Sequence, residues 1–417
     1  MRISIQTLGT RGDVQPYVAL ARGLLAAGHE VQLVAPAQFE DFVRAHGPDF
    51  AALPGEFLDL IETPAAKQAI AQGRGFSAGF KLLKQLKPMM RRVFDATWEA
   101  SRAFGPALIV HHPKVLAAPH IGEKLGVPLV LASPLPGFTP TAAFPSPLLP
   151  NVSLGPLNRL SHQLMAWSGA ALFSRPMAQW RAERLGLPRR GRTSGWRDLP
   201  TLYAYSPTLL PVPPEWGPNV LVSGFWFLDD ETAWTPQTAL ADFLAAGEAP
   251  VYVGFGSMPV ADPMALTALV VEATARAGCR AVLAAGRGKL GGVASAPHVH
   301  VVDEAPHDRL FPLVSAVVHH GGAGSTAAGL RAGKPTVICP FFGDQPFWGR
   351  RVAALGVGPS PIPQRDLTAE RLAEAIRLAT TDSGMRSRAE ALGAAMRAED
   401  GVAAAVAFIE RHSGARA

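Results

Sequence analysis

Residues 317–348 decide the fold of this chain, and they read VVHHGGAGSTAAGLRAGKPTVICPFFGDQPFW. The short β-branched run at 315–319 predicts a buried strand, residues 326–331 predict a helix, and residues 336–339 predict a second buried strand. A glycine-rich turn joins the first strand to the helix. Glycine lets the backbone approach a ligand closely, and the free N–H groups at a helix start favour an anion, usually phosphate. The stretch has neither a Walker Gly-Lys-Ser/Thr nor a Gly-x-Gly-x-x-Gly fingerprint, so the turn predicts an anion site without identifying the ligand.

A carboxylate and an amide, Asp344 and Gln345, follow this turn by about twenty residues. The turn together with this pair resembles the donor-binding motif of family 1 glycosyltransferases, and it is most similar to that of the sterol 3β-glucosyltransferases and their bacterial relatives. The resemblance implies that the turn binds the pyrophosphate of a nucleotide sugar and that Asp344 and Gln345 bind sugar hydroxyls. A carboxylate accepts hydrogen bonds and an amide both donates and accepts them, which suits vicinal hydroxyls.

A second loop of interest lies near the N-terminus. Residues 2–7 predict a strand, residues 15–27 predict an amphipathic helix, and the loop between them includes GTRGDVQP at 9–16. Parallel sheets bind ligands at the carboxyl ends of their strands, where this loop lies. Asp13 alone fits a helix N-cap. The loop, however, resembles Gly-Ser/Thr-Arg-Gly-Asp-Val-Gln-Pro of the sterol glucosyltransferases, which implies that Asp13 is the general base that removes the proton of the acceptor hydroxyl.

The same resemblance implies a larger donor site. Residues 303–311 resemble the nucleoside-binding turn of the family, with Glu304 in place of the plant tryptophan and His307 in place of the plant glutamine. The ribose-binding glutamate of the plant proteins would fall at Ala328, so uridine and thymidine donors both stay open. The predicted donor-binding residues are Thr10, Arg11, Ser257, Ala305, His307, His320, Gly322, Gly324, Ser325, Thr326, Asp344 and Gln345.

The acceptor is expected to bind mainly in the first half of the chain. The proline-rich stretch 133–150 resembles the acceptor loop of the sterol enzymes, and aromatic residues with few charges suit a flat apolar ligand. Residues 57–105 predict a helical region whose part 76–98 is basic and amphipathic. It fits an ordinary helix on the core, a wall of the acceptor pocket, or a surface resting on a membrane. The predicted acceptor-binding residues are Met90, Phe138, Thr139 and Phe144.

Length and composition set the frame for these sites. A chain of 417 residues exceeds one ordinary core, and 48% hydrophobic with only 17% charged residues excludes a disordered protein. With this length, the resemblance implies an α/β fold of the GT-B class, in which two Rossmann-like domains face each other across a cleft. The domains that it implies are an acceptor-binding domain at 1–230, a nucleotide-sugar-binding domain at 231–400, and a C-terminal helix at 401–417 that returns to the first domain.

The cysteines, the apolar runs and the net charge bear on the partners and the location of the protein. Cys279 and Cys339 lie in apolar surroundings and predict buried thiols, which fits a reducing, cytoplasmic location. No leader pattern or apolar run of about 20 residues is seen, so a soluble protein is expected, with membrane contact at most peripheral. The net charge of +6 suits a nucleoside diphosphate better than nucleic acid, because no aromatic-interleaved basic module accompanies it.

The expected reaction is a direct, inverting transfer of a hexose to a hydroxyl of an apolar acceptor such as a sterol, a lipid or a polycyclic natural product. UDP-glucose is the expected co-substrate. No Asp-x-Asp motif is present, so we expect no metal and no further cofactor. Two alternatives stay open at this point: a nucleotide-sugar epimerase, and a non-catalytic protein that binds nucleotide sugars or lipids.

Overall fold

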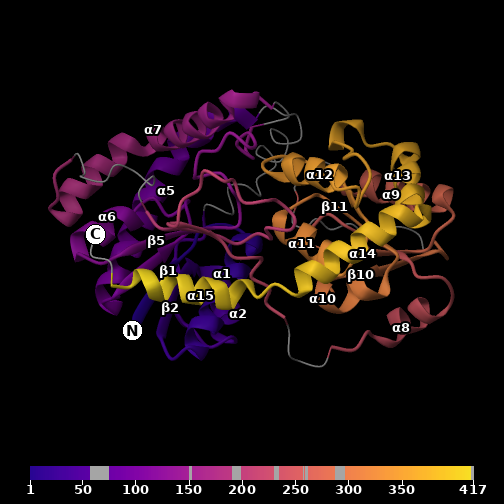
Figure 1. Ribbon diagram of the computed structural model, residues 1–417, viewed down its shortest axis with the longest axis horizontal. Coiled ribbons are helices and arrows are strands. Elements are labelled where there is room, and N and C mark those ends of the chain that lie inside the picture. The colour runs from indigo at the N-terminus through magenta and orange to yellow at the C-terminus, as the bar shows by residue number, and fades with distance from the viewer. Residues whose placement is uncertain are drawn as a thin grey trace. The chain divides into compact units, whose positions relative to one another are not determined.

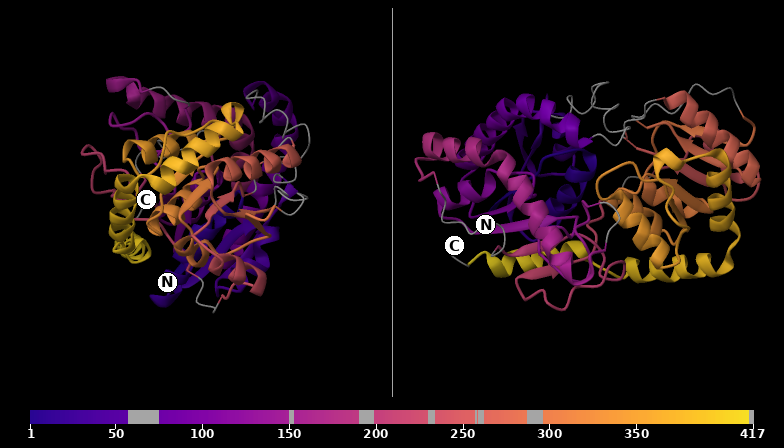
Figure 2. Two further views of the ribbon diagram at one scale, coloured as in Figure 1. Left: turned by 90° about the vertical axis from the view of Figure 1, so that its right-hand side faces the viewer. Right: turned by 90° about the horizontal axis from the view of Figure 1, so that it is seen from above.

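The structure is a computed structural model that describes residues 1–56, 75–149, 153–189, 199–229, 234–256, 258, 262–286 and 296–414, without the side chains of 75–87, 167–170 and 172. The chain divides into two compact units. Most described residues up to Leu228, together with those from Asp400 onward, form the first, and Asp229–Glu399 lies in the second. Each unit has one parallel sheet covered by helices (Figures 1 and 2), which confirms the predicted α/β class.

The sheet of the first unit has the strand order β3-β2-β1-β4-β5-β6-β7, and every neighbouring pair is parallel. Its strands are β1 Arg2–Gln6, β2 Glu30–Pro36, β3 Asp49–Leu53, β4 Leu108–His111, β5 Leu129–Ser133, β6 Thr201–Tyr203 and β7 Val220–Val222. Its helices are α1 Arg11–Ala26, η1 Ala37–Phe39, α2 Glu40–Arg44, α5 Gly75–Phe104, α6 Ala118–Leu125, η2 Gly155–Leu157, α7 Asn158–Leu185 and α15 Gly401–His412. The edge strand β3 was not predicted.

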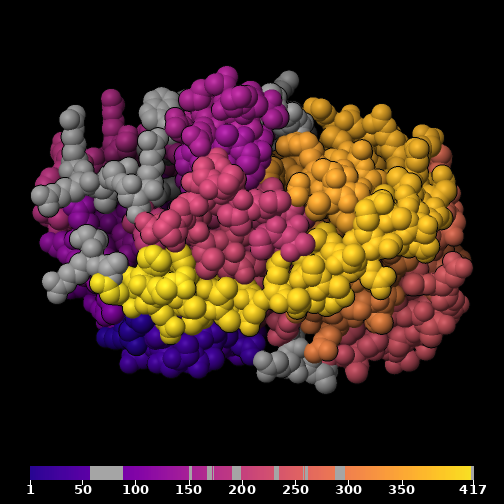
Figure 3. Space-filling model, viewed as in Figure 1, coloured from indigo at the N-terminus to yellow at the C-terminus, as the bar shows by residue number. Residues whose placement is uncertain are grey.

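Alternate residues of the strands face two different helical layers, as the two-residue period of a strand requires. Ile3 and Ile5 pack with α1 and α15, whereas Ile109 packs with α5 and α7. Figure 1 shows α15 beside α1, and Figure 3 shows the same C-terminal helix in yellow over the indigo N-terminal segment. The two helices touch so closely that a Cβ on Gly23 would come within 2.3 Å of Val402 Cγ1.

The sheet of the second unit has the strand order β10-β9-β8-β11-β12, again with parallel pairs throughout. Its strands are β8 Val251–Gly254, β9 Ala281–Ala284, β10 Val299–Val302, β11 Ala316–His319 and β12 Thr336–Ile338. Its helices are α8 Thr238–Ala245, α9 Pro263–Ala277, α10 His307–Leu310, η4 Phe311–Leu313, α11 Ala323–Arg331, α12 Gln345–Ala354, η5 Gln364–Asp366, α13 Ala369–Thr381 and α14 Ser383–Arg397. Cys339 is a buried free thiol in this core, and Cys279 is a half-buried one.

Two helices begin four residues earlier than their sequence patterns predicted. α1 starts at Arg11 instead of residue 15, because Thr10 and Asp13 form a capping box that stabilises an additional first turn. α12 starts at Gln345 instead of residue 349, because Pro346 occupies its first turn, where proline loses no hydrogen bond. In both cases the earlier start carries predicted site residues into the first turn of a helix.

Candidate functional site

The strand order reverses direction between β8 and β11 of the second unit, and such a switch point is where open α/β sheets bind ligands. Gly256 follows β8, and His320 follows β11. A Cβ on Gly256 would lie 3.4 Å from His320 Cε1, and a Cβ on Gly322 would lie 2.6 Å from His320 Nε2. The His320 ring therefore fills the space between these two loops, and Gly322 cannot be replaced by a larger residue without moving it.

The start of α11 lies at the same switch point. Gly322 is its N-cap and has no side chain to accept a hydrogen bond, so the N–H groups of the first turn stay available for an anion. Gly324 is exposed and Ser325 is half-buried in this turn. Thr326 is buried, and within the described part of the chain its Oγ1 has no hydrogen-bond partner. The glycine turn and helix start that were predicted to bind phosphate thus have the donors that an anion requires.

The two histidines that precede this helix are neutral at physiological pH. His319 Nδ1 accepts a hydrogen bond from the backbone N–H of Gly321 at 2.8 Å, which leaves the ring proton on Nε2. Burial lowers the pKa of His319 well below its usual value. Burial, followed by the nearby His307, lowers the pKa of His320 to about 4. The electrostatic attraction for an anion therefore comes from helix-start amides rather than from imidazolium charge.

The predicted nucleoside-binding turn lies at the end of β10 in the same unit. Ala305 is half-buried there, and His307 opens α10. The His307 ring stacks on Phe311 with centroids 4.3 Å apart, and its Nε2 lies 3.4 Å from the Tyr252 hydroxyl. Sequence reasoning missed Tyr252, whose position in strand β8 next to the switch point brings its hydroxyl to this turn.

The predicted sugar-binding pair begins helix α12, where both side chains already have protein contacts. Gln345 Oε1 accepts hydrogen bonds from the backbone N–H groups of Phe341 at 2.8 Å and Phe342 at 3.2 Å. Asp344 Oδ2 accepts one from Trp348 Nε1 at 2.8 Å. The carbonyl of Gln345 is therefore committed to the preceding loop, and its amide nitrogen donates to Met258 Sδ at 3.2 Å, which leaves the second amide N–H for recognising a hydroxyl.

A second switch point lies between β1 and β4 of the first unit, and Asp13 lies beside it. Asp13 Oδ2 accepts a hydrogen bond from the Thr10 backbone N–H at 2.9 Å. Asp13 Oδ1 lies 2.6 Å from Lys114 Nζ and 3.6 Å from His112 Nε2. Gly9 has φ of +143°, and a Cβ there would lie only 2.1 Å from Asp13 Oδ2. The carboxylate therefore packs directly against Gly9, and one of its oxygens accepts a hydrogen bond from the backbone at the start of the helix.

The surroundings of Asp13 keep it ionised. Burial opposes ionisation, but the Lys114 ammonium, His112, and the hydrogen bonds from Lys114 and Thr10 outweigh it, so the pKa of Asp13 lies below its usual 3.8. His112 Nδ1 accepts a hydrogen bond from the Lys114 backbone N–H, which leaves its proton on Nε2, toward Asp13. Burial, then the charge of Lys114, lowers the pKa of His112 to about 3, so this ring is a neutral donor.

Sequence reasoning missed His112 and Lys114 as site residues. Their signal is the one that identified Asp13, namely polar side chains directly after a buried parallel strand. Asp13 itself is not the N-cap, since Thr10 has that position and Asp13 is the third residue of the helix. Arg11, a predicted phosphate ligand, is exposed, donates from Nε to Gln15 Oε1 at 3.0 Å and lies over the Phe42 ring.

The predicted acceptor-binding residues lie in different environments. The backbone N–H groups of Phe138 and Thr139 donate to the Tyr203 hydroxyl at 3.2 and 2.7 Å. Phe144 is buried and packs against other rings, and Met90, a residue of α5, is buried in the core. Ser257, predicted to bind the donor, lies outside the described residues.

Among the described residues, no three His, Cys, Asp or Glu side chains come together in a way that could hold a metal ion. No helix in the described part of the chain combines the length and apolar character needed to cross a membrane.

Two family models match the chain. Residues 3–144 match the glycosyltransferase family 28 N-terminal domain, and residues 268–408 match the erythromycin biosynthesis protein CIII-like C-terminal domain. Two sterol 3-beta-glucosyltransferases of Arabidopsis thaliana are each 38% identical over 99% of this chain, which covers 66% and 68% of their lengths. A sterol 3-beta-glucosyltransferase of Neosartorya fischeri is also 38% identical over 99% of the chain, but the chain covers only 29% of that protein. The chain thus spans about two thirds of these plant relatives and under a third of this fungal one.

Solved structures resemble the whole chain at low sequence identity. The glycosyltransferase of kitacinnamycin matches with a TM-score of 0.74 at 20% identity, covering 99% of this chain and 98% of that one. The calicheamicin glycosyltransferase CalG4 matches with a TM-score of 0.73, the same identity and the same coverage. These likenesses concern the fold alone, and they confirm the predicted GT-B class.

Proposed function

The chain belongs to the glycosyltransferase family that includes the sterol 3-beta-glucosyltransferases, and from this premise we propose that it transfers a hexose from a nucleotide sugar to a hydroxyl of a sterol-like apolar acceptor. The proposal rests on one observation, the position and contacts of the Asp13 carboxylate. This ionised carboxylate lies at a sheet switch point. Its Oδ2 accepts a hydrogen bond from the Thr10 backbone, and its Oδ1 faces the Lys114 ammonium and the neutral His112 ring. The proposal further names glucose and UDP, metal independence and inversion at the anomeric carbon.

In the proposed reaction the acceptor oxygen forms a bond to the anomeric carbon while the bond from that carbon to the diphosphate oxygen breaks. The acceptor's proton goes to Asp13, and the electron pair of the broken bond leaves on the nucleoside diphosphate. Asp13 Oδ1 is the proton acceptor, because Oδ2 is used by the Thr10 backbone. Lys114 holds Oδ1 at 2.6 Å and is half exposed, so it can swing away to admit the hydroxyl. A carboxylate in hydrogen-bond reach contributes typically about 10² to 10⁴ in rate.

The leaving diphosphate would be stabilised by the second unit. The helix-start amides of α11, the neutral His320 ring and the unpartnered Thr326 hydroxyl are all donors that need no rearrangement when charge develops. Fixed dipoles of this kind act most strongly on charge that forms in the transition state. Asp344 and the amide of Gln345 would select the sugar, and the His307 turn would hold the nucleoside.

Calorimetric titration of the purified protein with UDP, TDP, UDP-glucose and TDP-glucose, without added metal, tests the donor side of this proposal. Tighter binding of UDP-glucose than of the other three is the expected result. Preference for the thymidine pair would replace UDP in the proposal, and no binding of any of the four would overturn it. Product analysis with UDP-glucose, with and without a sterol, separates transfer from epimerisation.

A further inference from the structure

Tyr17 is a fully buried residue of helix α1 that the proposed reaction does not use. It follows Asp13 by four residues, so the two side chains lie on the same face of the helix. The Tyr17 hydroxyl donates to the Ala132 carbonyl of β5 at 2.5 Å. Burial, then the charge of Asp13, raises the pKa of Tyr17 well above its usual value, so the hydroxyl stays protonated. Tyr17 therefore connects the helix that carries Asp13 to the sheet.

The Tyr17 ring lies between two other rings. It makes a T-shaped contact with His112, with ring centroids 5.8 Å apart and planes at 74°. It makes a second T-shaped contact with Trp226, with centroids 5.6 Å apart. The Trp226 indole is itself held, because its Nε1 donates to Ser223 Oγ at 3.0 Å. In a densely packed core, Tyr17 cannot turn away from His112 without displacing Trp226.

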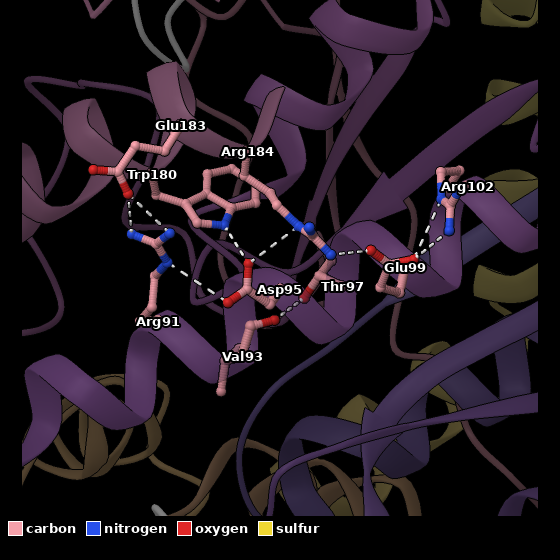
Figure 4. A network of polar contacts seen from close by, with 9 residues as sticks. All are labelled: Arg91, Val93, Asp95, Thr97, Glu99, Arg102, Trp180, Glu183 and Arg184. Atoms are coloured by element: carbon pink, nitrogen blue, oxygen red, sulfur yellow. Dashed lines mark hydrogen bonds and ion pairs between the residues drawn. The ribbon is translucent and has the colours of Figure 1, made fainter. Parts of the chain in front are cut away.

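The backbone below His112 is fixed from the opposite face of the same sheet. The His112 N–H donates to the carbonyl of Gln6, the last residue of β1, at 2.8 Å. The Gln6 side chain donates from Nε2 to Ser101 Oγ of α5 at 2.9 Å. Helix α5 is held in turn by α7, where Trp180 Nε1 donates to Asp95 Oδ1 at 2.9 Å within a network of ion pairs (Figure 4). The orientation of the His112 ring therefore depends on its own side-chain contacts.

Two contacts set that orientation. His112 Nδ1 accepts a hydrogen bond from the Lys114 backbone N–H at 3.0 Å, and the imidazole packs against the Tyr17 ring. In this orientation His112 Nε2 lies 3.6 Å from Asp13 Oδ1, the oxygen that takes the proton in the proposed reaction. An imidazole that turned about its bond to Cβ would no longer present Nε2–H to the carboxylate.

We infer that Tyr17 is a positioning residue, whose ring keeps the His112 imidazole oriented with Nε2–H toward Asp13. The ring performs this role, and the hydroxyl only anchors the ring to β5. The expected effect on turnover rests on the proposed function. The contact between the two rings does not, and it can be tested without any substrate.

Two substitutions separate the ring of Tyr17 from its hydroxyl. Tyr17→Phe keeps the ring and loses only the bond to Ala132, whereas Tyr17→Leu removes the ring. We expect Tyr17→Leu to lower the turnover of hexose transfer by about tenfold or more, because the donor beside Asp13 is misplaced. Tyr17→Phe is expected to have turnover close to that of the wild type. UDP affinity should be unchanged in both, because the glycine turn and the His307 turn belong to the second unit.

The matched control is Phe408→Leu in α15. Phe408 is fully buried in the same core as Tyr17, and its ring packs on His412 with centroids 4.3 Å apart. Its replacement removes a buried ring and should lower stability as Tyr17→Leu does, which urea unfolding measures. It should leave turnover at the wild-type level under conditions in which every variant is folded. An equal loss of turnover in Phe408→Leu would reduce Tyr17 to a core residue and overturn the inference.

A double-mutant cycle tests whether Tyr17 acts through His112. His112→Leu alone should lower turnover, and adding Tyr17→Leu should then lower it little further, because the ring that Tyr17 positions is already absent. A second loss as large as that of Tyr17→Leu in the wild type would show that the two residues act independently. That result, or wild-type turnover in either Tyr17→Leu or His112→Leu, would overturn the inference.

Nitrogen-15 NMR of protein labelled at histidine provides the test without substrate. The His112 ring signals are those that disappear in His112→Leu. In Tyr17→Leu they are expected to shift and broaden as the ring gains freedom, whereas in Tyr17→Phe and Phe408→Leu they should stay as in the wild type. Unchanged His112 signals in Tyr17→Leu would overturn the inference even if the wild type transfers hexose. A wild type without transfer activity would instead contradict the proposed function, and the NMR comparison would still decide the ring contact.

Discussion

Replacing Gly9 with alanine is expected to damage both the stability of the first unit and the proposed chemistry. The new Cβ would lie 2.1 Å from Asp13 Oδ2, so the carboxylate must leave its seat. Leaving breaks the capping bond from the Thr10 N–H, a loss of about 0.5 to 2 kcal/mol. The φ of +143° adds about 1 to 3 kcal/mol of backbone strain for a residue with a side chain. Together these predict a loss of about 1.5 to 5 kcal/mol in the free energy of unfolding.

The activity of the Gly9→Ala variant should fall as well, because the proton acceptor is displaced, and the fall should approach that of removing the carboxylate. Gly12→Ala is the matched control, since it lies in the same loop-helix junction and the nearest atom to its added Cβ is 4.0 Å away. Alanine in this helical position should be neutral or stabilising by up to about 1 kcal/mol. Urea unfolding followed by circular dichroism, with sugar transfer measured on the same samples, provides the comparison. A Gly9→Ala variant as stable and active as the wild type would refute the close contact between Gly9 and the Asp13 carboxylate.

Three further substitutions test the two sites. Asp13→Asn should lower turnover by roughly 10²-fold or more while nucleotide-sugar affinity stays nearly unchanged, which turnover and calorimetry on one preparation would reveal. Lys114→Met removes a charge that lowers the pKa of Asp13, so the acid limb of the rate profile should move to higher pH. The lowered pKa of Asp13 also contributes stability that is present above the unfolded value of 3.8 and is lost as the pH falls through the folded pKa. The Lys114→Met variant should lose part of this stability, at most about 1 kcal/mol because the lysine of the pair is half exposed. An unchanged pH profile would show that Lys114 does not control the pKa of Asp13. Asp344→Ala should weaken UDP-glucose binding more than UDP binding, with a small loss of stability from the missing Trp348 bond; equal loss for both ligands would contradict a sugar-binding role.

The sequence predicted the strands well wherever they are apolar and buried. All the predicted strands have counterparts in the structure, with ends that differ by a few residues at most, because their β-branched runs have no alternative to burial. Strand β3 escaped detection because DFAAL contains no β-branched residue, and its aspartate and two alanines have low strand propensity. Helix starts were less predictable, because the capping box of Thr10 and Asp13 depends on side-chain bonds that periodicity does not encode.

The site was predictable where a motif concentrates glycines and polar residues, and less so where tertiary contacts decide. The turn before α11 and the loop before α1 both lie at switch points, as ligand-binding loops do. Lys114 is about a hundred residues from Asp13, and only the pairing of β1 with β4 brings them together. The commitment of Gln345 to the backbone of the loop before it is likewise a packing outcome that residue types alone do not indicate.

The most direct test of the central claim is product analysis after incubation with UDP-glucose and cholesterol, comparing the wild type with Asp13→Asn. The account predicts a steryl hexoside and one UDP released per hexoside in the wild type, with roughly 10²-fold less of both in the variant. A hexoside formed equally fast by Asp13→Asn would remove Asp13 as the base. A wild-type protein that binds UDP-glucose but forms no hexoside with cholesterol or with any other apolar alcohol would contradict the proposed transfer itself.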